Sequence, residues 1–146
     1  ELMYNLCEQD SKTVVSAFDP QTGAINNLQS VSTVTSHFRG STLAAEILIS
    51  ADDRFIYASN RLGDSLAVFK VGDDGTLTLQ DEAWMHADYG RAMMFDPSGN
   101  FLFCANQRSD AVTSFRVDKA SGQLGFTENF TPVGSPTTFA CMDTEV

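Results

Sequence analysis

One segment of this chain is written at least twice, and this repeat limits what the chain can fold into. Residues 49–69 read ISADDRFIYASNRLGDSLAVF, and residues 95–115 read FDPSGNFLFCANQRSDAVTSF. At a shift of 46 residues, the two segments match at these aromatic and polar positions: Phe55 with Phe101, Asn60 with Asn106, Asp64 with Asp110, and Phe69 with Phe115. A weaker copy ends in VVSAFDPQTGAI, with Phe18 in the place of Phe69. Repetition at a period in the forties is typical of folds built from stacked units.

Each unit resembles four short strands joined by turns. In the second copy, AAEILIS, RFIYAS, SLAVFKV and TLTLQDEAWM have the composition of strands, and turn-forming residues separate them. Four antiparallel strands per repeat make the blade of a β-propeller. The sequence therefore predicts an all-β fold with about three four-stranded antiparallel blades. We expect the three blades near residues 1–36, 37–85 and 86–131. A further blade would start at 132–146, with its innermost strand at 136–142.

Three blades do not close a ring. Propellers typically contain about 4–8 blades, and a repeat unit buries its apolar face only against its neighbours. We therefore expect the chain to be part of a longer protein, so that either the remaining propeller blades or a second copy cover its open flanks.

The composition excludes some kinds of partner. The 146 residues carry a formal net charge of −10, whereas binding to nucleic acid or to an anionic membrane needs a basic surface. No apolar run approaches the roughly 18 residues of a membrane span. The three cysteines are odd in number; Cys104 and Cys141 lie in apolar runs, where we expect buried, inert thiols. No cysteine or histidine pair has zinc-ligand spacing, so we expect no metal and no cofactor.

The connections between strands can be assigned to two ends of the blades. In an antiparallel blade they alternate, so the tight turns near residues 51–53, 73–75, 97–99 and 120–122 share one end. Polar residues that turn chemistry does not explain fall at the opposite end: Glu46, Asn60, Arg61, Arg91, Asn106, Gln107 and Arg108. We therefore expect a binding site at that end, where the innermost strands surround a central channel.

The two best copies resemble a known family. AAEI, SNR and ANQ-x-SD, each in register with its blade, are similar to motifs of the β-propeller 6-phosphogluconolactonase family, which includes carboxymuconate-cyclising enzymes. The resemblance implies the C-terminal portion of a seven-bladed propeller and a cytoplasmic enzyme of the pentose phosphate pathway type. The implied reaction is hydrolysis of the lactone ester of 6-phosphogluconolactone, a small anionic sugar lactone. The chain departs from the family at Gly90-Arg91, where Pro-Arg is usual, and at Leu62, where Gly is common.

The resemblance suggests roles for the polar residues. Arg91 and Arg61 would hold the anionic substrate, since a guanidinium is always charged and grips phosphate or carboxylate through two donors. Glu46 would orient or activate the water, or it would only pair with an arginine. Asn60, Asn106 and Gln107 would donate to the substrate.

Other interpretations stay open. The recurrence of Asn60 and Asn106 favours a structural role, and Asp64 and Asp110 are expected to lock turns or blades. The alternative functions are action on another anionic lactone, such as a carboxymuconate derivative, and a non-catalytic binding or scaffold module.

Overall fold

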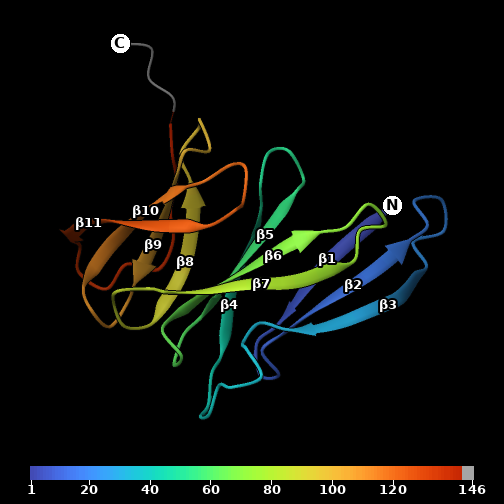
Figure 1. Cartoon of the computed structure of the whole chain (residues 1–146), viewed down its shortest axis with the longest axis horizontal. Coiled ribbons are helices and arrows are strands. Elements are labelled where there is room, and N and C mark those ends of the chain that lie inside the picture. Colours follow the sequence, from blue (N-terminus) through green and yellow to red (C-terminus); the bar gives the residue numbers. More distant parts are fainter. Residues whose placement is uncertain (143–146) are drawn as a thin grey trace.

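The computed structural model describes residues 1–142, which contain eleven strands in three antiparallel sheets (Figure 1). The first sheet contains β1 (Leu2–Cys7), β2 (Lys12–Phe18) and β3 (Ile25–Ser32). The second contains β4 (Ala44–Ile49), β5 (Phe55–Asn60), β6 (Ser65–Val71) and β7 (Leu77–Trp84). The third contains β8 (Gly90–Phe95), β9 (Phe101–Asn106), β10 (Ala111–Val117) and β11 (Leu124–Pro132).

The predicted all-β blade architecture is confirmed. In the second and third sheets the strands pair in chain order, so each is a four-stranded meander. The first sheet has three strands, which correspond to the last three of the other blades. The N-terminal and C-terminal sheets lie on opposite sides of the middle sheet (Figure 1), and the first strands β4 and β8 contact each other.

The hydrophobic core lies between the blades. One buried cluster, which includes Tyr57, Val68 and Phe115, joins the second blade to the third. Another, which includes Val15 and Phe69, joins the first blade to the second. Every residue of β5 is buried, because this strand belongs to the middle blade and has a neighbour on both faces. Apolar residues on both faces of a strand are thus explained by stacking of blades.

The repeat alignment in the first copy was wrong by two residues. In the first blade Ser16 pairs with Met3, and at the equivalent position of the second blade Phe69 pairs with Ile56. Ser16 therefore takes the place of Phe69 in the repeat. Phe18 corresponds instead to the end of β6. The weak copy shares turn chemistry with the others but not the same aromatic position, so matching phenylalanines misplaced the register.

The aromatic positions also show where the stack ends. Phe55, Phe69 and Phe115 are each at most 3% exposed, which confirms that they pack between blades. Phe18 and Phe101 are only partly buried. They lie on the outward faces of the first and third blades, where the described residues supply no further blade.

Two expectations for the C-terminal segment were wrong. Residues 136–142 form no strand, because a strand needs a hydrogen-bonded neighbour and none of the described strands pairs with this segment. Cys141 is exposed rather than buried, whereas Cys104 is buried as expected. Burial raises the pKa of the Cys104 thiol, so it stays protonated and inert. The remainder of the expected further blade, residues 143–146, lies outside the described residues.

The two recurring aspartates fix the segments that follow their blades, and Asp64 thereby ties the second blade to the third, as predicted. Asp64 and Asp110 adopt positive φ values of 49° and 50° at the same point of the repeat. The Asp64 carboxylate accepts a hydrogen bond of 3.0 Å from the Tyr89 backbone N–H, in the segment that leads into the third blade. Asp110 accepts one of 2.8 Å from Ser135. Each aspartate thereby fixes the segment that comes after its own blade.

Candidate functional site

The blades have two chemically different ends. We call the end with residues 8–11, 61–64 and 107–110 the connection end, and the end with the tight turns near 50–54, 72–75, 96–100 and 118–122 the turn end. At the connection end, β4 and β8 begin with irregular pairing. The register shifts between Ala44 and Ile47, around Glu46, and again between Gly90 and Ala92, at Arg91. Such bulges redirect side chains and occur next to active sites.

A cavity of about 300 Å³ opens at the connection end. Its lining residues come from all three blades and from the segment after them: Glu8, Ala45, Arg61, Arg91 and Thr137. The expectation that Arg61 and Arg91 gather at one end is therefore met by the geometry. Two guanidiniums and one carboxylate around a polar cavity suit an anionic ligand of small size.

Arg61 is the buried member of this group, with 7% of its side chain exposed. Its Nη2 forms an ion pair with Glu8, whose side chain is 56% exposed, and contacts the Ala44 carbonyl at 3.5 Å. Its Nη1 donates a hydrogen bond of 3.2 Å to the Tyr89 hydroxyl. Its Nε has no hydrogen-bond partner among the described residues. Because this guanidinium has one carboxylate partner and also lines the cavity, it is a candidate for binding a further anion.

The structure brings Glu8, rather than Glu46, to the two arginines. Glu46 accepts a hydrogen bond of 3.3 Å from the Ile47 backbone N–H, and among the described lining residues its neighbour Ala45 takes part instead. A catalytic role for Glu46 stays a prediction. Sequence reasoning missed Glu8 because it lies in the weak copy. The signal was its register: Cys7 aligns with Asn60, so Glu8 takes the place of Arg61 one blade earlier.

The two recurring asparagines point into the protein. Asn60 is fully buried; its amide donates to the Thr33 carbonyl at 2.9 Å, and its oxygen accepts from the Thr33 hydroxyl at 2.6 Å. Asn106 is fully buried and donates to Thr113 at 2.9 Å. These contacts support the structural role. Gln107 is partly exposed and its backbone N–H donates to the Tyr89 carbonyl at 3.0 Å, so contact of its side chain with a ligand stays a prediction.

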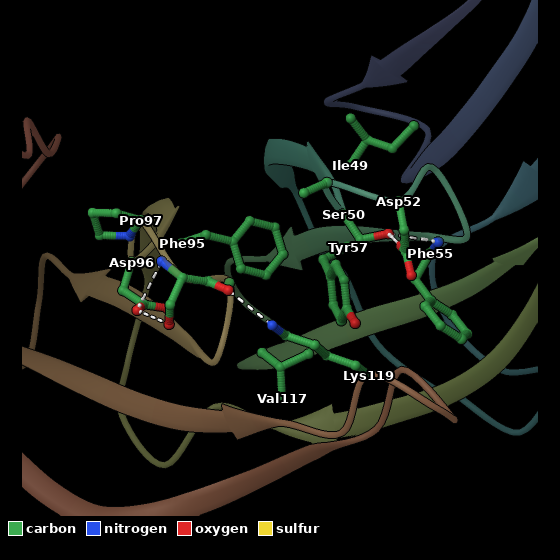
Figure 2. Close-up of a pocket in the computed structure, with 13 residues that line it drawn as sticks. Ile49, Ser50, Asp52, Phe55, Tyr57, Phe95, Asp96, Pro97, Val117 and Lys119 are labelled. Atoms are coloured by element: carbon green, nitrogen blue, oxygen red, sulfur yellow. Dashed lines mark hydrogen bonds between the residues drawn. The ribbon is translucent and has the colours of Figure 1, made fainter.

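A second cavity, of about 340 Å³, lies at the turn end between the second and third blades (Figure 2). Figure 2 shows the Phe95 and Tyr57 rings side by side there; they pack edge to face, with 5.5 Å between centroids. Its polar groups already serve the turns: Asp96 accepts from the Phe101 N–H at 2.8 Å, and the Lys119 amine donates to the Ser98 carbonyl at 2.8 Å. The connection end, where two arginines line one polar cavity, is therefore the better candidate site.

Among residues 1–142, no helix has the length and apolarity to cross a membrane. The same residues contain no group of three or more histidine, cysteine, aspartate or glutamate side chains placed to hold a metal ion.

Comparison with known proteins gives the family. Residues 1–142 match the family model described as "Lactonase, 7-bladed beta-propeller". The chain belongs to this lactonase family. The match covers all three blades and the segment after them, so the arginines of the connection end belong to a lactonase propeller.

Several relatives are similar over most of this chain but over little of their own length. The 6-phosphogluconolactonase of Bacillus subtilis is 29% identical over 122 residues, which are 83% of this chain and 35% of that protein. The chain spans about a third of the curated relatives that it matches. Its place at the C-terminal side of the ring stays a prediction.

Two solved structures are similar in both fold and sequence. A protein from Lactobacillus plantarum has a TM-score of 0.90 at 32% identity, covering 94% of this chain and 40% of that one. The structure titled as the Pseudomonas aeruginosa periplasmic gluconolactonase has a TM-score of 0.83 at 32% identity, covering 89% of this chain and 36% of that one. The blade geometry is thus that of larger lactonase propellers.

Proposed function

We propose that this chain supplies the anion-binding part of a lactonase that hydrolyses the ester bond of a phosphorylated sugar lactone, 6-phosphogluconolactone. The observation that carries the proposal is the shared cavity of Arg61 and Arg91, in which Arg61 is buried and has one carboxylate partner. The relative from Bacillus subtilis is named 6-phosphogluconolactonase, which supports the reaction class.

The reaction requires three contributions from the protein. A water oxygen attacks the lactone carbonyl carbon, the carbonyl oxygen becomes negatively charged, and the ring C–O bond then breaks. The ring oxygen takes up a proton, and the product is an open-chain acid. Catalysis therefore requires a base or orienting group for the water, a donor to the oxyanion, and a binding site for the phosphate.

We propose that the two arginines bind the negatively charged groups of the substrate, the phosphate and the developing oxyanion. Arg91 is exposed at the cavity, so it can accept a phosphate without displacing a protein partner. Arg61 is held by Glu8 and Tyr89, so its guanidinium is fixed before the ligand arrives. A fixed donor costs no reorganisation when charge develops, which is the condition for stabilising an oxyanion.

Two carboxylates are candidates for handling the water. Glu8 lines the cavity and contacts Arg61, so its position supports a role in orienting or deprotonating water. Glu46 sits in the bulge next to Ala45 and remains the second candidate. Comparing the lactone turnover of Glu8→Gln with that of Glu46→Gln distinguishes these two candidates.

The test is turnover of 6-phosphogluconolactone by the full-length protein, with the unphosphorylated gluconolactone as a matched substrate. Arg91→Ala should raise KM for the phosphorylated substrate about tenfold or more, as expected for loss of a charge-assisted bond, with a smaller effect on gluconolactone. Arg61→Ala should lower kcat by about 10²–10³ if it serves the oxyanion. Unchanged turnover in both variants contradicts the proposal.

The same experiment separates the alternatives. Turnover of a carboxymuconate-type lactone in preference to the phosphorylated sugar lactone would favour the related enzyme. Binding of 6-phosphogluconate, without turnover of any lactone, would favour a non-catalytic module. The cytoplasmic location is part of the proposal and is tested by cell fractionation.

A further inference from the structure

Tyr89 occupies a central place at the connection end that no repeat motif indicates. It lies in the segment between β7 and β8, directly before the Gly90-Arg91 bulge. Its backbone has a positive φ of 67°, which a bulky side chain rarely adopts. The strain is held on both sides, because its N–H donates to Asp64 at 3.0 Å and its carbonyl accepts from Gln107 at 3.0 Å.

The Tyr89 side chain contacts two arginines at once. Its hydroxyl accepts the hydrogen bond of 3.2 Å from Arg61 Nη1. The guanidinium carbon of Arg61 lies 5.0 Å from the ring centroid, and that of Arg108 lies 4.0 Å from it. An arginine over an aromatic face is attracted by the ring quadrupole. The ring is therefore held by Arg108 on its face while its hydroxyl holds Arg61.

We propose that Tyr89 is a positioning residue for the lactonase site, which fixes the Arg61 guanidinium at the cavity where the substrate's negative charge binds. This inference rests on the proposed function of Arg61. A guanidinium on a long side chain has several rotamers, and ordering it costs free energy when the ligand binds. Tyr89 and Glu8 order the Arg61 guanidinium before the ligand binds. Glu8 alone is a weaker restraint, because its side chain is half exposed.

The positive φ of Tyr89 supports this positioning role. A glycine or asparagine would adopt this backbone at lower cost, but neither provides an aromatic face for Arg108 and a hydroxyl acceptor for Arg61. Strain kept at one residue and fixed by two backbone hydrogen bonds is typical of functional sites. The same segment continues into Arg91, so Tyr89 links the positions of the two cavity arginines.

The experiment compares two tyrosine variants of the full-length protein. Tyr89→Phe removes only the hydroxyl, and Tyr89→Leu also removes the aromatic face. Tyr57→Phe is the matched control, because it removes the same hydroxyl from a hydrogen bond at the turn end. The measurements are the Kd of inorganic phosphate by calorimetry, KM and kcat for 6-phosphogluconolactone, and the melting temperature.

We expect Tyr89→Phe to lower kcat about threefold to tenfold, and Tyr89→Leu about tenfold or more, with KM and the phosphate Kd changed less, because Arg61 is assigned to the oxyanion and Arg91 to the phosphate. Tyr57→Phe should lower the melting temperature and leave kcat unchanged. A purely structural Tyr89 would behave like the control, and that result overturns the inference. Should Tyr89→Leu fail to fold, Tyr89→Phe alone decides.

The result is distinguishable from failure of the proposed function. If Arg61→Ala lowers kcat while both Tyr89 variants keep the wild-type kcat, the proposed function stands and the positioning role is wrong. If Arg61→Ala and Arg91→Ala both leave turnover unchanged, the proposed function fails, and this inference fails with it.

Discussion

The hydroxyl of Tyr57 donates a hydrogen bond of 2.9 Å to the carbonyl oxygen of Gly122, and this bond joins the second blade to the third. The same bond recurs one blade earlier, where the Tyr4 hydroxyl donates to the Gly75 carbonyl at 2.9 Å. In both cases a tyrosine of one blade contacts a tight turn of the next. The repeat therefore includes a fastening at the turn end, distinct from the aspartate lock at the connection end.

Removing the Tyr57 hydroxyl should destabilise the protein. Tyr57→Phe leaves the Gly122 carbonyl without this donor, which typically costs about 1–3 kcal/mol. The measurement is the free energy of unfolding in urea at pH 7. Because the change lies at the turn end, lactone turnover should be unaffected, and a variant as stable as the wild type would contradict the expectation.

Tyr57 should also make the free energy of unfolding depend on pH under alkaline conditions. Burial raises the pKa of Tyr57 to about 12 from its ordinary value of 10. Between these values the folded state keeps a proton that the unfolded state releases, so stability falls as pH rises from about 10 to about 12. Tyr57→Phe should make the unfolding free energy less dependent on pH in this window. Equal slopes in variant and wild type would mean that the phenol titrates normally.

Gly122 should not tolerate a side chain. It adopts a φ of 77°, and a Cβ there would lie 2.4 Å from the Phe55 ring. Gly122→Ala therefore combines backbone strain with overpacking, and we expect a loss of about 2–5 kcal/mol. Gly99→Ala is the control, because φ is 67° but the nearest atom is 4.0 Å away; it should cost about 1–2 kcal/mol. Similar losses in both variants, measured by thermal unfolding, would show that packing against Phe55 does not matter.

Much of the fold followed from the repeat. Alternation of strands and turns predicted the blades, and alternation of connections predicted that Arg61 and Arg91 share one end. Glu8 and Tyr89 were missed for a physical reason. Their contacts with Arg61 cross between blades, and such contacts depend on how the sheets are inclined to one another. That inclination arises from packing of whole sheets and has no local pattern in the sequence.

The polar residues that recur between the copies have structural roles. Asn60, Asn106, Asp64 and Asp110 recur, and all four make hydrogen bonds that hold a blade or its connections. Arg61 and Arg91 have no counterpart of the same type in the other copies, and they line the cavity. In a repeat protein, a polar residue that departs from the repeat is thus the stronger functional candidate.

Asp64 should matter for both stability and substrate binding, whereas Asp110 should matter mainly for stability. Asp64→Ala leaves the Tyr89 N–H without its acceptor and frees the segment that carries Arg91. We expect a loss of about 1–2 kcal/mol in unfolding free energy and a higher KM. Asp110→Ala removes the equivalent bond to Ser135 and serves as the matched control. If both variants raise KM equally, the effect does not pass through Tyr89.

The outward faces of the first and third blades should drive association when this 146-residue chain is isolated. Phe18 and Phe101 are partly buried there, while Phe69, between blades, is fully buried. Apolar surface left open at the end of a stack favours contact with another such surface. Sedimentation velocity should show oligomers that decrease in Phe18→Ser, because an outward apolar group is lost at little cost to folding. Phe69→Ser should instead unfold the chain, since it places a hydroxyl in a core. A stable monomer of the unmodified chain at micromolar concentration would show that the described blades cover their own apolar surface.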